Sequence, residues 1–229
     1  MSIVITNSKV NYGPNVVTDG LVLYLDAANS QSYPGTGLNW YDLSENENTG
    51  SLNAESIGTT TSGVMNFNGT SNYIDTPYGA NVNPYSTPLS TNIWVNPSTI
   101  GTNMMFLSTG QSRGNGDTNQ RFYLSIYNGY WDWGIRTSSW SSGDIAANTF
   151  WNMITIVIDS DAKFYLNGSH IYTKSINDTY VLNAVFRIGA HDSNYYFQGN
   201  IRNLQIYNKG LTQSEITQNY NAQKSRFGL

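Results

Sequence analysis

The chain has 229 residues, of which 39% are apolar and only 11% are charged, and its formal net charge is −4. Its Lys and Arg residues are scattered without a basic run, so we expect no nucleic-acid partner. The longest apolar run, residues 153–158, is far shorter than the roughly 20 residues of a membrane-spanning helix, so we expect no membrane insertion.

Cysteine is absent, which excludes disulfides and thiolate metal ligands. The first ten residues lack the long apolar stretch and the small-residue cleavage site of a signal peptide. We therefore expect the chain to be made and folded in a cytoplasm.

In chain order, residues 1–18 are expected to form an extended amino-terminal arm, and residues 19–229 a single domain. Within the domain, short runs rich in Val, Ile, Tyr, Phe and Trp alternate with clusters of Gly, Asn, Ser and Pro, which is typical of antiparallel strands. Strands are expected at 21–27, 64–68, 72–76, 89–97, 104–109, 121–128, 130–137, 151–159, 163–168, 170–175, 186–190 and 199–207. About a dozen strands predict an all-β fold, a sandwich or jelly roll.

Two local signals are explicit. Asn167-Gly168 predicts a tight hairpin, because both central positions of a type I′ turn need positive φ. One helix is expected at 211–224, where Thr212 serves as N-cap and Glu215 completes a capping box.

The aromatic stretch at 130–137 has a predicted orientation. Strand alternation places Trp131, Trp133 and Ile135 on one apolar face, which we expect to point into the core. The other face carries Tyr130, Asp132, Gly134 and Arg136. Trp140 follows in an expected loop.

Catalytic signals are weak. A glycosidase needs two carboxyl groups roughly 5–10 Å apart, and Asp132 has no acid two or four residues away. The serines near His170 and His191 carry no nucleophile-elbow signature. We therefore expect no enzymatic activity. Asp159-Ser-Asp161 lacks the remaining residues of a calcium loop and favours a hairpin tip.

Binding through aromatic loops is the more plausible alternative. Residues 191–200 combine amide, carboxylate and tyrosine side chains, which suit the hydroxyl groups and apolar faces of sugars. The candidate carbohydrate-binding residues are Tyr130, Arg136, Trp140, Asp192, Asn194, Tyr195 and Tyr196. In the competing interpretation, Tyr195 or Phe197 only anchors the loop to the core.

Four segments carry a family resemblance: FNGTSNYIDT (67–76), LSTNIWVNP (89–97), NTFWNMITIVIDSDAKFYLNG (148–168) and FQGNIRNLQIYNKGLTQSEITQNYNA (197–222). In this order they resemble the laminin-G-like, concanavalin A-like lectin/glucanase superfamily. The resemblance implies a jelly-roll sandwich of two antiparallel sheets, one concave, with rim loops where some members bind calcium and glycans. The E-x-D-x-x-E strand of the glucanase branch is absent, which argues further against hydrolysis.

The closing motif of the family usually has an acid where this chain has Arg202. A calcium ligand is therefore lost at that point, and Asp26 and Asp75 remain as isolated acids. No metal site is predicted and no cofactor is required, although the resemblance leaves calcium open.

The segments 16–52 and 219–229 also resemble structural proteins of tailed bacteriophages, especially those of marine cyanobacteria. That resemblance implies a virion protein, such as a fibre, decoration or tail-associated protein, made in the host cytoplasm and assembled with other virion proteins as a homo-oligomer or in many copies. The arm could then add a strand to a neighbouring sheet. The alternative is a module that binds host-surface glycans, and a glycoside hydrolase is the third and least favoured hypothesis.

Overall fold

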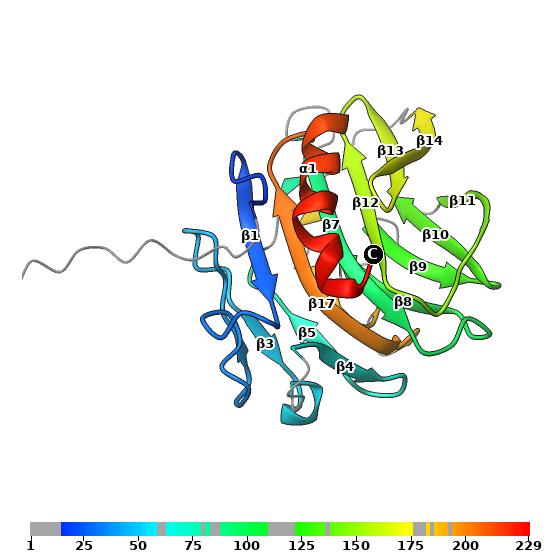
Figure 1. Ribbon diagram of the computed structural model, residues 1–229. Coiled ribbons are helices and arrows are strands. Elements are labelled where there is room, and N and C mark those ends of the chain that lie inside the picture. The colour runs from blue at the N-terminus through cyan, green and yellow to red at the C-terminus, as the bar shows by residue number, and fades with distance from the viewer. Residues whose placement is uncertain are drawn as a thin grey trace, which may run out of the picture.

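The computed structural model (Figure 1) describes residues 15–58, 63–78, 81–82, 88–109, 122–135, 138–175, 182–183, 186–191 and 194–229. For residues 81–82, 135, 138–144 and 182–183 it describes the backbone alone. Among the helices of these ranges, none is long and apolar enough to cross a membrane.

Two antiparallel sheets form the sandwich (Figure 1). The seven-stranded sheet has the order β1 (Leu21–Asp26), β17 (Gln198–Tyr207), β7 (Leu89–Pro97), β12 (Asn152–Ile158), β13 (Asp161–Leu166) and β14 (Ser169–Ser175), with β4 (Met65–Asn68) also paired to β17. The eight-stranded sheet has the order β11 (Ser138–Ala146), β10 (Tyr130–Ile135), β9 (Phe122–Tyr127), β8 (Met104–Thr109), β16 (Phe186–Ile188), β5 (Ile74–Asp75), β3 (Gly50–Leu52) and β2 (Asn39–Trp40). The short strands β6 (Asn81–Val82) and β15 (Leu182–Asn183) pair separately. The predicted all-β, two-sheet antiparallel jelly roll is confirmed.

Every strand that the alternation predicts is present, with its ends within two residues of the expected ones. The alternation misses the short strands β2, β3, β6 and β15. It also misses the longer strand β11, whose sequence SSWSSGDIA is rich in serine and lies at the edge of its sheet. Trp140 lies within this strand as the register partner of Trp133, so its expected place in a loop is wrong. A polar edge strand has little apolar alternation to detect, which explains the error.

Apolar side chains of both sheets fill the space between them. Trp131 and Trp133 are 1% and 0% exposed and belong to this core, which confirms the predicted inward face of β10. The ring of Phe106, on β8, meets that of Trp131 edge to face at 6.0 Å between centroids. This aromatic cluster is therefore mainly structural.

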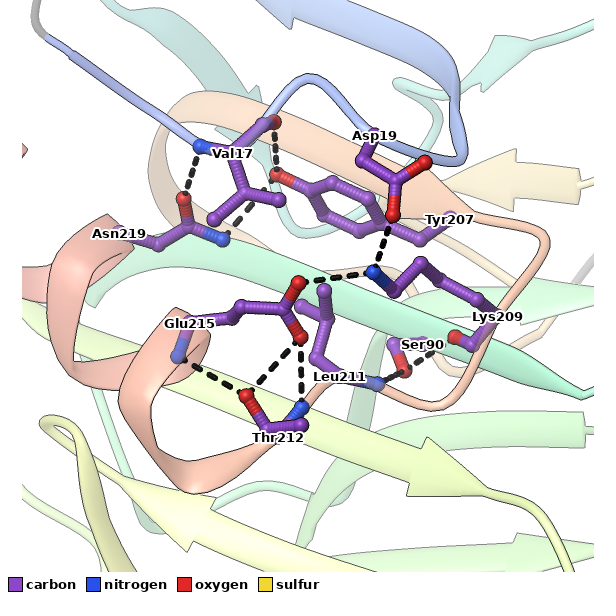
Figure 2. Close-up of polar contacts among 9 residues, drawn as sticks. All are labelled: Val17, Asp19, Ser90, Tyr207, Lys209, Leu211, Thr212, Glu215 and Asn219. Carbon is purple, nitrogen blue, oxygen red and sulfur yellow. Dashed lines mark hydrogen bonds and ion pairs between the residues drawn. The ribbon is translucent and has the colours of Figure 1, made fainter.

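The helix α1 (Gln213–Gln223) covers the outer face of the seven-stranded sheet, in front of β7 and β17 in Figure 1. Its Ile216 shares a second apolar cluster with Trp94 and Tyr207 of the sheet. The predicted capping box is confirmed, since the Thr212 hydroxyl accepts from the Glu215 N–H and the Glu215 carboxylate accepts from the Thr212 N–H (Figure 2). Two short 3-10 helices, η1 (Glu55–Ile57) and η2 (Lys224–Phe227), complete the fold.

The described end of the expected arm lies against α1. The Val17 N–H donates to Asn219 Oδ1 at 2.8 Å, and the Tyr207 hydroxyl donates to the Val17 carbonyl at 3.1 Å (Figure 2). Val16 and Val17 are both buried, so these two residues stabilise the domain itself. Residues 1–14 of the expected arm lie outside the described residues.

Candidate functional site

The outer face of the eight-stranded sheet carries side chains that line up from strand to strand. Asp132 of β10 lies opposite Ser125 of β9, which lies opposite Met105 of β8. Nearer the β9–β10 turn, Tyr130 lies opposite Tyr127. Direct register partners have Cβ atoms about 5 Å apart, so these five residues form one surface, which we call the outer-face patch.

The β9–β10 turn presents the two tyrosines together. Its central residues Asn128 and Gly129 have φ values of 50° and 82°, as a type I′ turn requires. Tyr127 and Tyr130 flank this turn and are 52% and 40% exposed. Two phenol rings therefore stand side by side, accessible to solvent, at one end of the sheet.

Asp132 forms the polar floor of the patch. Its carboxylate accepts a 2.9 Å hydrogen bond from the Ser125 hydroxyl, and both residues are buried. Burial raises the pKa of Asp132 to about 6, although hydrogen bonds from Ser125 and the Trp133 N–H act in the opposite direction. Perturbed carboxyl pKa values of this kind are concentrated at functional sites.

The loop between β16 and β17 returns to the patch. Tyr196 forms a parallel bridge with Met105, and the Met105 N–H donates to the Tyr195 carbonyl at 2.8 Å. Tyr195 is exposed and has a φ of 54°, uncommon for a residue other than glycine. The loop thus places two more tyrosines beside the patch.

Of the predicted site residues, Tyr130 lies at the β10 side of the patch, Tyr195 and Tyr196 lie beside its Met105 side, and Asn194 is exposed in the same loop. Arg136 and Asp192 lie outside the described residues, and for Trp140 only the backbone is described. Sequence reasoning missed Tyr127 and Met105. Tyr127 could have been found, because it faces Tyr130 across the Asn-Gly turn, but Met105 reaches the patch through strand pairing alone.

A second row of side chains crosses the same face farther from the turn. Gly134, Tyr123, Ser108, Arg187 and Asp75 are successive register partners from β10 to β5. Arg187 holds Asp75 through Nε and Nη2 at 2.7 and 2.9 Å, with its guanidinium 4.0 Å from the centroid of the Tyr73 ring. Asp75 therefore has a cationic partner, which the sequence did not indicate.

Asp26 also has a cationic partner. Its buried carboxylate accepts two hydrogen bonds of 2.8 Å from Arg226 and one from the Ala28 N–H. Arg202, at the position of the usual family acid, lies with its guanidinium 5.2 Å from the centroid of the Phe227 ring. Asp26 and Arg226 are 200 residues apart in the sequence, so no local sequence pattern could have predicted their pairing.

The Asp159 carboxylate pairs with Lys163 at 2.6 Å, at the tip of the β12–β13 hairpin. Within the described ranges, no group of three or more His, Cys, Asp or Glu side chains could hold a metal ion.

An open groove of about 490 Å³ lies between the β13–β14 turn and α1, on the other sheet. Gln213 Nε2 donates to the Gly168 carbonyl at 2.8 Å and to Thr217 Oγ1 at 3.1 Å. These groups dock the turn onto the helix, so the outer-face patch is the better candidate for a ligand site.

Several solved structures share this fold. The receptor-binding domain of botulinum neurotoxin D has a TM-score of 0.67 and 17% identity, over 90% of this chain and 53% of that one. The botulinum neurotoxin serotype D ligand-binding domain in complex with N-acetylneuraminic acid has a TM-score of 0.66 and 17% identity, over 90% and 52%. Domain 4 of AbnA, a GH43 extracellular arabinanase from Geobacillus stearothermophilus, in complex with arabinotriose, has a TM-score of 0.61 and 19% identity, over 86% and 96%. This chain spans about half of the botulinum domains.

No curated protein sequence matches the chain. The family model of the concanavalin A-like lectin/glucanases superfamily matches residues 68–217, which is more than half of the chain. The matched span contains the whole outer-face patch and the strands β7 to β17. The chain belongs to the concanavalin A-like lectin/glucanases superfamily.

Proposed function

We propose that the protein is a carbohydrate-binding domain and that the outer-face patch, with Tyr195 and Tyr196 beside it, is its saccharide site. The exposed pair Tyr127 and Tyr130 carries this proposal, because adjacent phenol rings offer flat apolar surface and hydroxyl groups at once. Asp132, two residues farther along β10 on the same face, supplies an acceptor for sugar hydroxyls.

The chemistry of the patch favours a neutral saccharide. Its five members are two tyrosines, a serine, a methionine and Asp132, so its charge is negative or zero. An acidic sugar would be repelled by the ionised carboxylate. Domain 4 of AbnA, a neighbour in fold, is a complex with the neutral saccharide arabinotriose and supports this class of ligand. The botulinum domain in complex with N-acetylneuraminic acid, an acidic sugar, supports carbohydrate binding in general.

We propose further that the domain binds its saccharide without cleaving it. Among the outer-face residues whose side chains the structure describes, the carboxylates are Asp132 on β10 and Asp75 on β5; Asp144 of β11 is described by its backbone alone. Strands β10 and β5 are four positions apart in the sheet order, or about 19 Å at the usual strand spacing. Glycosidase pairs stand roughly 5–10 Å apart, and Asp75 is already held by Arg187.

An array of neutral and acidic polysaccharides tests the proposal with the purified full chain. We expect binding to a neutral polysaccharide and no release of reducing ends. Tyr130→Ala should weaken that binding about tenfold, since one aromatic contact is worth up to about 1.4 kcal/mol. Affinity electrophoresis in gels that contain the polysaccharide measures both proteins.

Tyr41→Ala is the matched control, because Tyr41 is 44% exposed and follows β2, at the opposite edge of the sheet from β11. It should bind like the wild type. The absence of binding to every array member, or equal losses in the two variants, would contradict the proposed site.

We propose a virion component as the setting in which this domain works. The segments 16–52 and 219–229, which carry the resemblance to tailed-phage structural proteins, contact each other through Asp26–Arg226 and Val17–Asn219. The two segments therefore form one structural unit. Because both parts of this unit resemble tailed-phage structural proteins, the resemblance supports a role in a virion.

Immunogold labelling of phage particles purified from host lysates tests this setting. Antibodies raised against the purified protein should label intact particles in several copies each. Label confined to the soluble fraction of the lysate would contradict the virion assignment and leave the saccharide site unaffected.

A further inference from the structure

Three loops meet at the end of the sandwich beside Tyr127 and Tyr130. Residues 98–103 join β7 to β8, residues 128–129 form the β9–β10 turn, and residues 147–151 join β11 to β12. The Asn128 N–H donates to Asn103 Oδ1 at 2.8 Å, and the Ala147 N–H donates to the Gly129 carbonyl at 2.8 Å. These bonds join the three loops into one continuous rim.

The rim exposes a large apolar side chain. Phe150 is 73% exposed, more than any other large hydrophobic residue among those described. An aromatic ring exposed to water lacks the favourable free energy that its burial would give. Exposed apolar patches mark interaction sites more often than single exposed residues do. Tyr127 and Tyr130 are also exposed at this end of the sandwich, so Phe150 is one of three exposed rings there.

The rim carries no charge. Its three loops read STIGTN, NG and ANTFW, without Asp, Glu, Lys, Arg or His. A nucleic acid or a charged peptide would find no ionic partner here. A neutral ligand with apolar faces and many hydroxyl groups fits a surface of aromatic, amide and hydroxyl side chains.

The distance across the rim exceeds one sugar ring. The Thr149 carbonyl accepts from Asn96 Nδ2 of β7 at 2.6 Å, so this part of the loop lies at the seven-stranded sheet. Ala147 is bonded to the turn of the eight-stranded sheet, and packed sheets lie about 10 Å apart. Phe150 and the tyrosine pair are therefore separated by about the thickness of the sandwich.

We propose that the saccharide site continues from Tyr127 and Tyr130 over the rim to Phe150. Its ligand is then a neutral polysaccharide chain held along several consecutive units, rather than one terminal sugar. This inference rests on the proposed carbohydrate-binding function and specifies the class of ligand for the same site.

Ladders of arabino-oligosaccharides and cello-oligosaccharides, from the monosaccharide to the octasaccharide, test the inference by titration calorimetry. Wild-type affinity should rise with chain length and then level off. Phe150→Ala should keep the wild-type affinity for the shortest ligands that bind and lose about tenfold for the longest, as expected for one aromatic contact. Tyr130→Ala should lower the affinity at every length.

Two further variants complete the test. Phe150→Tyr retains a ring and should retain the long-chain affinity, and Tyr41→Ala should match the wild type throughout. If Phe150→Ala follows the wild-type length dependence while Tyr130→Ala loses binding, the rim extension is wrong and the outer-face patch stands. If the wild type binds no member of either ladder and no array polysaccharide, the proposed function fails and this inference fails with it.

Discussion

At the residue scale, Asp132 is held in a position that disfavours its charge. Burial raises its pKa from the ordinary 3.8 to about 6. Between these two values the folded protein binds more protons than the unfolded chain, so stability falls as pH rises from about 4 to about 6 and stays lower above that. Residues that destabilise a fold in this way are concentrated at functional sites.

Replacement of Asp132 by asparagine should therefore stabilise the protein at neutral pH. A pKa rise from 3.8 to about 6 corresponds to about 3 kcal/mol at pH 7, which is the upper limit of the expected gain. At pH 4 the two proteins should differ by less than about 0.5 kcal/mol in free energy of unfolding. Urea unfolding at the two pH values measures the difference, and an equal difference at both would contradict the assignment of the raised pKa.

At the element scale, two Asn-Gly turns share one backbone conformation but have different surroundings. Gly129 and Gly168 both have a φ of 82°. A methyl group at Gly129 would meet no atom closer than the Ile100 carbonyl oxygen at 3.8 Å, whereas one at Gly168 would lie 3.1 Å from Tyr220 Cβ on α1. No side chain therefore packs closely on Gly129 in the β9–β10 turn, whereas the β13–β14 turn is packed against the helix.

Alanine substitutions should separate these two roles. Gly129→Ala should cost about 1 kcal/mol, the penalty of a side chain in the left-handed region. Gly168→Ala should cost at least about 1 kcal/mol more, because the added methyl group also overpacks the contact with Tyr220. Thermal unfolding of both variants checks the order, and equal losses would show that the turn is not tightly packed on α1.

At the scale of the whole molecule, contacts between β1, β7 and the C-terminal segment close the fold. Arg226 pairs with the buried Asp26 of β1, and the neighbouring Phe227 stacks on Trp94 of β7 at 4.0 Å between centroids. The C-terminal segment thus covers a sheet whose outer face would otherwise expose aromatic rings.

Arg226→Met should destabilise the protein by about 3 kcal/mol, because it leaves the Asp26 carboxylate buried without its partner. The double variant Asp26→Asn with Arg226→Met removes that charge and should recover at least about 1 kcal/mol. Guanidinium unfolding measures both proteins. A double variant less stable than Arg226→Met alone would show that the ion pair is not the main contribution of Arg226.

Features that depend on neighbouring residues could be predicted from the sequence. The capping box of Thr212 and Glu215, the Asn167-Gly168 turn and the inward face of Trp131 and Trp133 are all confirmed. Each depends on side-chain period or backbone conformation within a few residues.

The sequence by itself determined the apolar strands and which face of β10 is apolar, because alternation and turn residues act within one element, but it did not reveal the polar strand β11 or the shortest strands. Only the tertiary structure decided what those strands place together. Sheet order sets Met105 beside Ser125 and Tyr196, and it joins Asp75 to Arg187 and Asp26 to Arg226. These contacts link residues far apart in the chain, and neither period nor propensity carries information about which strands become neighbours.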